Sequence, residues 1–184
     1  MLNNFAIQIL QKKMTKKIDQ EYNPKFMLRA IELSEIAYKS GKGLPIGCVI
    51  VRNGEIIGEG HNEIFERVNP TSHGEMVAIE RACKNINNLQ LSDCQIYTTL
   101  EPCPMCLGAI YWAKISKVYY ANTNADASKV GFDDTFIFNE LRKNANERKI
   151  NFLYVPDSNA MNVLEEWKSK DFGSAQPWNE DDTI

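Results

Sequence analysis

The feature that most constrains the fold of this chain is a set of three metal-ligand residues carried by two separate segments. His73 lies in segment 71–76, which reads TSHGEM, and Cys103 and Cys106 follow about thirty residues later in EPCPMC. Histidine and cysteine are ligands that zinc prefers, and a site with three protein ligands leaves one coordination position open. Any fold that uses these residues together must bring the two segments to one point.

The spacing of these residues predicts how the two segments fold locally. Pro102 is typical of a helix start, and an i,i+3 spacing at that start directs the thiols of Cys103 and Cys106 to one face. His73 is expected in the first turn of the preceding helix. The positive ends of both helices would then face the site and favour thiolates.

Glu75 follows His73 by two residues and is predicted to be the proton-transferring acid and base rather than a ligand. Each motif also has a simpler interpretation. Ser72 and Glu75 fit a capping box, and the two cysteines fit a redox pair or half of a structural zinc site, for which His61 is the only other histidine. Taken together, the four residues favour a catalytic zinc site with one ion per subunit, because they form the pattern H-x-E and P-C-x-x-C of zinc-dependent nucleobase deaminases.

Hydrophobic periodicity and turn signals predict the order α-β-β-α-β-α-β-α-β-α. Asn53-Gly54 is a hairpin turn signal, and the helix between the third and fourth strands predicts that these two strands are parallel. The fold class is therefore α/β, a three-layer α/β/α sandwich with a five-stranded mixed sheet. The strands are expected at 48–51, 55–60, 94–100, 117–121 and 150–155. The helices are expected from Pro24, at 73–85, from Pro102, at 136–142 and at 159–170, and 122–134 is expected to be a polar loop.

The length of 184 residues suits one domain, which is predicted at 23–170. Residues 1–22 contain a cluster of four lysines and are predicted to form a poorly ordered arm. Residues 171–184 form an acidic tail and are a candidate active-site lid.

Charge and cysteine usage limit the classes of partner. A net charge of -3 gives no general attraction to nucleic acid, and no apolar run is long enough to cross a bilayer, so neither a nucleic-acid nor a membrane partner is expected. The five cysteines form no regular disulfide framework, which predicts reduced thiols and a cytoplasmic location.

Four stretches resemble the cytidine deaminase-like superfamily and, within it, the bacterial-type guanine deaminases. They are GCVIVRNGEIIGEGHN at 47–62, NPTSHGE at 69–75, EPCPMCLGAIYWA at 101–113 and ADASKVGFDDTFIFNE at 125–140. The first and third are similar to adenosine deaminases acting on tRNA as well. The fourth stretch, with GFDD at 131–134, indicates guanine.

The resemblance implies hydrolysis of guanine to xanthine and ammonia in purine salvage or catabolism. It also implies a homodimer whose exchanged C-terminal segments cover the partner's active site. Asn62 matches the asparagine that hydrogen-bonds the base, and Asp126 matches an acidic residue near the exocyclic amine that assists proton movement. The simpler interpretations are a hairpin-ending turn residue for Asn62 and a solvated loop acid for Asp126.

Some residues depart from the family pattern, among them Ile46 and Cys48, which stand where small and aromatic residues are common, and three other functions are alternatives. Gly74 replaces an alanine, and the tail after Trp167 does not match cleanly. A guanosine deaminase would share these motifs and need only room for the ribose. A tRNA adenosine deaminase is expected to have a basic groove around its site, and the net negative charge of this chain argues against one. A non-catalytic, zinc-stabilised scaffold would not need Glu75.

Overall fold

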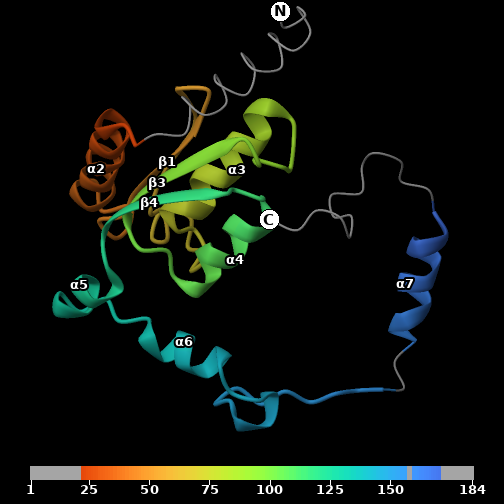
Figure 1. The fold of residues 1–184 in the computed structure, drawn as a ribbon. Coiled ribbons are helices and arrows are strands. Elements are labelled where there is room, and N and C mark those ends of the chain that lie inside the picture. Colours follow the sequence, from red (N-terminus) through yellow and green to blue (C-terminus); the bar gives the residue numbers. More distant parts are fainter. Residues whose placement is uncertain (1–21, 157–158, 171–184) are drawn as a thin grey trace, which may run out of the picture. The chain divides into compact units, whose positions relative to one another are not determined.

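A computed structural model of the chain describes residues 22–156 and 159–170. The described residues form two compact units, one ending at Asp133 and one beginning at Asp134. In chain order, the first unit contains α2 (Pro24–Lys39), β1 (Gly47–Arg52), β2 (Glu55–His61), α3 (Gly74–Ile86), β3 (Cys94–Leu100), α4 (Pro104–Trp112), β4 (Lys117–Asn122) and α5 (Asn124–Lys129) (Figure 1). The predicted tail at 171–184 and, apart from Tyr22, the predicted arm at 1–22 lie outside the described residues.

The sheet of the first unit has the strand order β2-β1-β3-β4. Strand β1 is antiparallel to both of its neighbours, whereas β3 and β4 are parallel, as the intervening helix predicts. Asn53 and Gly54 both have positive φ, 52° and 78°, which is the conformation of the predicted hairpin turn. The mixed sheet is therefore confirmed.

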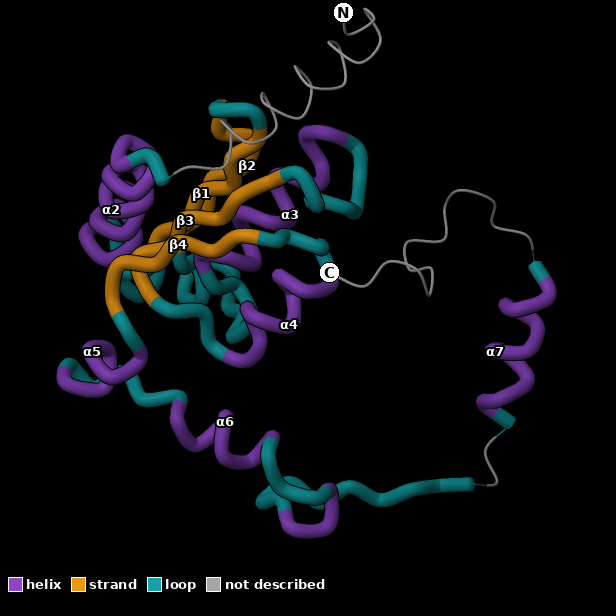
Figure 2. The backbone as a smooth tube through the Cα atoms, viewed as in Figure 1, coloured by secondary structure: helices purple, strands orange, loops and turns teal. Residues whose placement is uncertain are grey.

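Helices cover both faces of this sheet (Figure 2). Side chains alternate along β1, so Val49 and Val51 pack with α2, whereas Cys48 and Ile50 pack with α3 and α4. The α2 layer begins at Asn23, whose side chain accepts a hydrogen bond from Lys25 N, followed by the predicted proline. The three layers of the predicted sandwich are present in the first unit.

Close packing of α3 on β2 depends on two glycines in the strand. A Cβ atom on Gly60 would lie 2.2 Å from the carbonyl oxygen of Gly74, and one on Gly58 would lie 2.5 Å from that of Ala78. The two glycines therefore make room for the helix backbone. This packing holds the start of α3, and with it His73, against the end of β2.

The predicted fifth strand is wrong, because the sheet of the described residues has four strands. Segment 150–155 has no strand pairing, and its side chains are exposed, with Leu153 at 85% and Tyr154 at 88%. A strand is stable only when a neighbour pairs with its backbone and covers one face, and neither is provided here. The β-branched and aromatic composition that predicted the strand does not supply that neighbour.

Part of the expected polar loop at 122–134 is helical. In α5, the side chain of Thr123 accepts from Asp126 N while the Asp126 carboxylate accepts from Thr123 N, which is a capping box. This reciprocal pair of hydrogen bonds stabilises a helix of only six residues.

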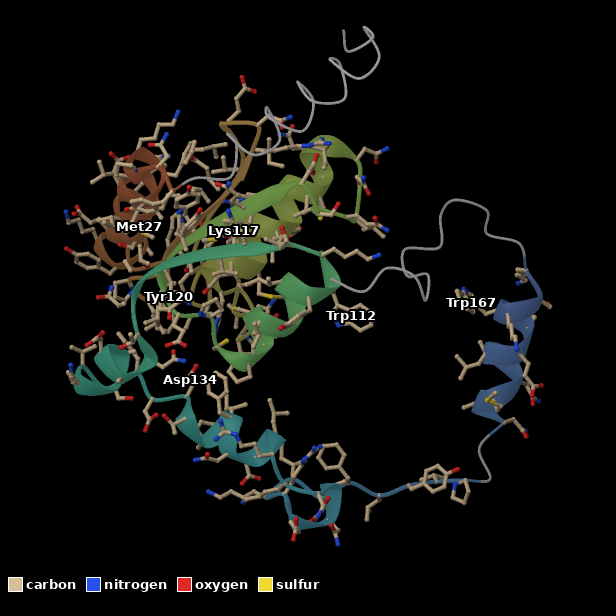
Figure 3. All side chains as sticks on the ribbon, in the orientation of Figure 1. Met27, Trp112, Lys117, Tyr120, Asp134 and Trp167 are labelled. Atoms are coloured by element: carbon tan, nitrogen blue, oxygen red, sulfur yellow. The ribbon has the colours of Figure 1, made fainter. Side chains whose placement is uncertain are left out.

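The second unit contains α6 (Thr135–Leu141), a 3-10 turn (Ala145–Glu147) and α7 (Ala160–Ser169). Both α-helices lie where periodicity predicts them. No residue of α7 is buried, although Val163, Leu164 and Trp167 recur at helical spacing and form an apolar stripe along it. Figure 3 labels Trp167 on this helix. Among the helices of both units, none has the length and apolar character needed for a bilayer crossing.

Candidate metal centre and active site

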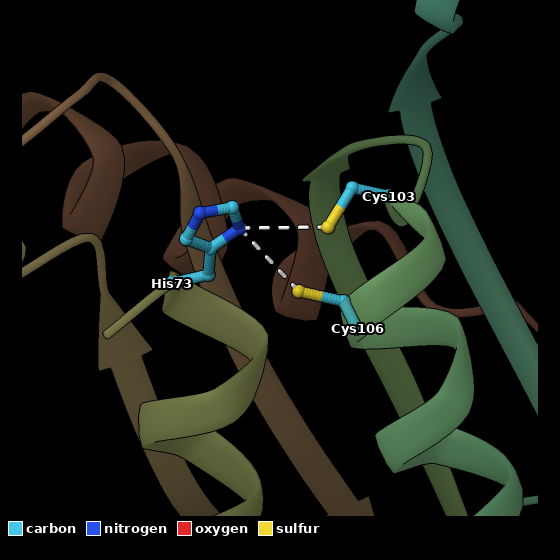
Figure 4. A group of neighbouring side chains, drawn as sticks. All are labelled: His73, Cys103 and Cys106. Carbon is cyan, nitrogen blue, oxygen red and sulfur yellow. Dashed lines mark hydrogen bonds between the residues drawn. The ribbon is translucent and has the colours of Figure 1, made fainter. Parts of the chain in front are cut away.

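His73, Cys103 and Cys106 converge at the N-termini of two helices, as their spacing predicts. His73 is the N-cap of α3, Cys103 is the N-cap of α4, and Cys106 lies in the first turn of α4. The Nδ1 atom of His73 lies 3.6 Å from the sulfur of each cysteine (Figure 4). All three ligand atoms lie within 4.8 Å of one another.

This geometry fits zinc. With ordinary zinc–nitrogen and zinc–sulfur bond lengths, a nitrogen and a sulfur ligand of a tetrahedral ion lie about 3.6 Å apart, which is the distance from His73 Nδ1 to each sulfur here. All five cysteines are free, so Cys103 and Cys106 are not a disulfide. In the described part of the chain this group has three members, and His61 is not among them, which leaves a tetrahedral ion one open position.

The thiols of Cys103 and Cys106 are linked by a hydrogen bond, which shifts their pKa values in opposite directions. The hydrogen bond from Cys106 lowers the pKa of Cys103 to about 4, and hydrogen bonding to His73 contributes in the same direction. The same hydrogen bond and burial raise the pKa of Cys106. A cation bound to both sulfurs would take the place of the proton in that hydrogen bond, which is how thiolate ligands couple metal binding to proton release.

Glu75 is a buried carboxyl group beside these ligands, with 3% of its surface exposed. Its Oε1 accepts a hydrogen bond from the Thr98 hydroxyl at 3.2 Å, and its Oε2 lies 3.5 Å from the sulfur of Cys106. Burial raises its pKa. The N-cap of α3 is His73 and no side chain caps that helix, so the capping-box interpretation of Ser72 and Glu75 does not describe the structure.

Asn62 directly follows β2 and is fully buried. Its Oδ1 accepts hydrogen bonds from Leu44 N at 3.1 Å and from Ile64 N at 3.4 Å. Its Nδ2 is buried and has no hydrogen-bond partner among the described residues. An unpaired buried donor costs about 1–3 kcal/mol, so this amide has a donor to offer to a ligand. The turn interpretation explains the bonds of Oδ1 but not the free Nδ2.

Gly74 brings the start of α3 close to the segment before β1. A Cβ atom at this position would lie 3.1 Å from the carbonyl oxygen of Ile46, which accepts a hydrogen bond from Asn62 N at 2.9 Å. The glycine that departs from the family pattern therefore leaves slightly more room between His73, Ile46 and Asn62 than alanine would.

Asp126 is not part of the metal cluster. Its Oδ2 accepts hydrogen bonds from the backbone and hydroxyl of Thr123, and its Oδ1 pairs with Lys129 at 2.8 Å. Lys129 first, and then Thr123, hold the pKa of Asp126 well below its usual range. Its role in proton movement stays a prediction.

A cavity of about 220 Å³ lies beside Asp126. Its apolar lining includes Leu100, Ala127, Val130 and Phe132, and it contains none of the three ligands. Ile46 also lines the cavity and is hydrogen-bonded to Asn62, so the cavity adjoins the candidate base-binding residue.

Two residues near the site have no distinct signal in the sequence. Thr98 lies opposite Cys48 in the register of β1 and β3, so its side chain is on the face of the sheet that packs against α3. This position allows its hydroxyl to contact Glu75. Glu63 is a buried acid next to Asn62, paired with Arg67 and Arg81. Threonine in a strand and glutamate in a loop are common, so neither is conspicuous before the tertiary contacts are known.

The sequence is similar to a deaminase family and to individual deaminases. Residues 20–122 match the family described as the cytidine and deoxycytidylate deaminase zinc-binding region. The chain is 45% identical over 144 residues to guanine deaminase of Bacillus subtilis, covering 78% of this chain and 92% of that protein. It is 34% identical over 145 residues to tRNA-specific adenosine deaminase of Aquifex aeolicus, covering 79% and 93%.

A solved structure agrees with these sequence similarities. The X-ray structure of the Bacillus subtilis guanine deaminase superposes with a TM-score of 0.78 at 43% identity, covering 84% of this chain and 97% of that one. The described fold is therefore similar to a deaminase fold over most of its length.

Proposed function

The chain belongs to the zinc-binding cytidine and deoxycytidylate deaminase family, and we propose that it is a guanine deaminase, which hydrolyses guanine to xanthine and ammonia. The observation that carries the choice of guanine is the 45% identity to a guanine deaminase along 92% of that protein. The buried Glu75 beside His73, Cys103 and Cys106 supports hydrolysis rather than a scaffold, because a structural zinc site needs no adjacent acid.

In the reaction, water adds to the ring carbon that bears the amine, and the carbon–nitrogen bond breaks to release ammonia. His73, Cys103 and Cys106 would hold the zinc, which supplies a Lewis acid that lowers the pKa of water. Glu75 takes one proton from the attacking water and gives it to the ring nitrogen, and it then passes the proton that remains on the added hydroxyl to the leaving amine. Because Thr98 engages Oε1, the oxygen that transfers the proton is Oε2, on the Cys106 side.

Asn62 and Asp126 complete the proposed site. The unpaired Nδ2 of Asn62 donates to the base, while the bonds from Leu44 N and Ile64 N hold its amide in one orientation. Its presence supports a polar ligand, because a site with a buried donor rejects bases that cannot accept from it. Asp126 acts from the wall of the adjoining cavity.

Zinc-loaded protein is expected to release ammonia from guanine. The measurement compares guanine, guanosine, cytosine, cytidine and a tRNA anticodon-loop oligonucleotide under the same conditions. The 34% identity to a tRNA-specific adenosine deaminase makes that oligonucleotide the main alternative substrate. Turnover of guanosine or the oligonucleotide, with guanine inert, would refute the proposal.

We also propose a homodimer. Tyr111 and Trp112 on α4 are 60% and 64% exposed, and α7 buries none of its apolar stripe, so both units have apolar surface for a second chain. Chains of 21.0 kDa should therefore sediment as dimers. Trp112→Glu is expected to weaken the dimer, whereas Phe65→Glu, at another exposed aromatic, should not. A wild-type monomer at micromolar concentration would argue against the assembly.

Exchange of C-terminal segments is the finer form of this proposal. One chain carries Glu75→Gln and an intact α7, and the other keeps Glu75 but carries Leu164→Glu and Trp167→Glu. Each is expected to be inactive alone. Activity after mixing supports exchange, because only then does an intact α7 cover an intact site. No recovery in mixed dimers would restrict the segment to its own chain.

The free state of all five cysteines supports a cytoplasmic location, which we propose and which cell fractionation would check. Recovery of the protein only in an oxidising compartment would contradict it.

A further inference from the structure

Glu63 is a buried carboxylate that the proposed chemistry does not use. Only 4% of its side chain is exposed. Arg67 Nε lies 2.5 Å from one carboxylate oxygen, and Arg81 Nη2 lies 2.7 Å from the other. A buried charge is retained only when such partners satisfy it. Two arginines on one buried carboxylate therefore make a rigid, directional clamp.

This clamp lies between two residues of the proposed active site. The loop from Asn62 to His73 is closed at its base, because Glu63 N donates to Ser72 O at 2.9 Å. One end of the loop thus carries the proposed base-binding amide, and the other carries a candidate metal ligand.

The arginines connect this loop to the helix that carries Glu75. Arg67 belongs to the loop itself, and its backbone N–H donates to Glu63 O at 2.9 Å. Arg81 belongs to α3, and its Nη1 also donates to the carbonyl oxygen of Glu59 in β2 at 2.9 Å. Among the described residues, Glu63 is the carboxylate that pairs with both arginines, so it links the loop, the helix and the strand.

Asn62 depends on this arrangement for its orientation. Its Oδ1 bonds come from Leu44 N on one side and Ile64 N on the other, and Ile64 directly follows Glu63. A displacement of the Glu63 backbone therefore moves both Asn62 and one of the two donors that orient its amide. The metal ligands Cys103 and Cys106 are on α4 and do not share these contacts.

We propose that Glu63, held by Arg67 and Arg81, is a positioning residue that sets the orientation of Asn62 toward the base. This role rests on the proposed function, since it assumes that Asn62 binds the substrate. Because Asn62 contacts the base in the ground state as well as in the transition state, a disturbed clamp weakens uniform binding. It therefore raises KM more than it lowers kcat.

Glu63→Gln removes the charge and keeps the size. The expected result is a KM for guanine raised on the order of tenfold or more, with a smaller change in kcat and an unchanged zinc content. Asn62→Ala serves as the reference for the full loss of the amide. Glu63→Gln combined with Asn62→Ala should raise KM no further than Asn62→Ala alone, because Glu63 acts through Asn62.

The matched control is Glu59→Gln. Glu59 also lies between two elements and is held by two hydrogen bonds from Arg29, both at 2.7 Å, but these join β2 to α2 rather than to the loop. A purely structural clamp would lower the thermal midpoint in both variants and leave both KM values near that of the wild type. That result would overturn the positioning role.

A second variant covers the case in which Glu63→Gln does not fold. Arg81→Lys keeps the positive charge but loses the planar guanidinium that contacts Glu63 and the Glu59 carbonyl at once. It should therefore raise KM by a factor between those of the wild type and Glu63→Gln. A wild-type KM in a folded Arg81→Lys variant would also count against the proposal. If the wild-type protein turns over another substrate of the panel instead of guanine, the proposed function fails. The same comparison of KM values, made with that substrate, still tests the role of Glu63.

Discussion

Replacing Glu75 by glutamine is expected to lower kcat on guanine by about 10²- to 10⁴-fold while the protein keeps its zinc. Glutamine preserves the size of the side chain and can still accept a hydrogen bond from the Thr98 hydroxyl, but it cannot take a proton from water. The three candidate ligands are unchanged, and Glu75 lies beside them without being one of the group. Steady-state kinetics and elemental analysis of the same preparation measure the two quantities.

Two further variants separate proton transfer from positioning and from the second proposed acid. Thr98→Val removes the hydrogen bond to Oε1 but leaves the carboxylate, so a smaller loss of kcat is expected than for Glu75→Gln. Asp126→Asn tests the predicted assisting role, and wild-type kcat in that variant would leave Asp126 only its structural role in the capping box of α5. Full activity of Glu75→Gln, or loss of its metal, would contradict the role given to Glu75.

Where local chemistry determines an element, it could be predicted from the sequence. Asn23-Pro24 begins a helix because its cap and first turn are satisfied within four residues, and Asn53-Gly54 turns because both residues adopt positive φ. The strand predicted at 150–155 depends on a neighbour elsewhere, which its own residues cannot specify. The capping box of α5 is also local, but a polar segment of six residues carries no hydrophobic periodicity that would distinguish a helix from a loop.

The metal cluster could be predicted for a related reason. The spacing of Cys103 and Cys106 determines their relative position on a helix start, and His73 reaches them because the start of α3 lies beside the start of α4. Thr98 and Glu63 are different, because their contacts follow from the register of β1 with β3 and from the packing of α3 against the 62–73 loop. No local sequence pattern predicts the contact of Thr98 with Glu75 or that of Glu63 with Arg81. Residues that act through another side chain are therefore the ones that cannot be predicted from the sequence.

Cys106→Ser is expected to abolish turnover and to weaken zinc binding severely. A serine hydroxyl is not deprotonated at neutral pH, and its oxygen is a poorer partner for zinc than a thiolate. Two ligands, His73 and Cys103, would remain, and we expect the zinc affinity to fall by more than about a hundredfold. Changes in surrounding residues that are not ligands already cost about 10- to 100-fold.

The loss of zinc should also appear in thermal stability. Zinc at about a thousandfold excess over its dissociation constant adds about 4 kcal/mol to the free energy of unfolding, because it binds the folded chain alone. Wild-type protein should therefore gain several degrees in Tm on addition of zinc and lose them with a chelator. Under the same conditions Cys106→Ser should gain at most about 1.4 kcal/mol, because a site weakened a hundredfold has only about a tenfold excess of zinc. Cys106 is fully buried, so the variant also loses some packing and starts from a lower Tm without zinc.

Cys83→Ser is the matched control for this experiment. Cys83 has the same chemistry and lies on α3, but it is partly exposed, and its sulfur contacts the carbonyl oxygen of Leu89 rather than the cluster. Its variant is expected to keep the zinc-dependent rise in Tm and wild-type turnover. A zinc-dependent rise in Cys106→Ser equal to that of Cys83→Ser would show that the stabilising metal binds elsewhere. In that case the convergence of His73, Cys103 and Cys106 would have to be explained without zinc.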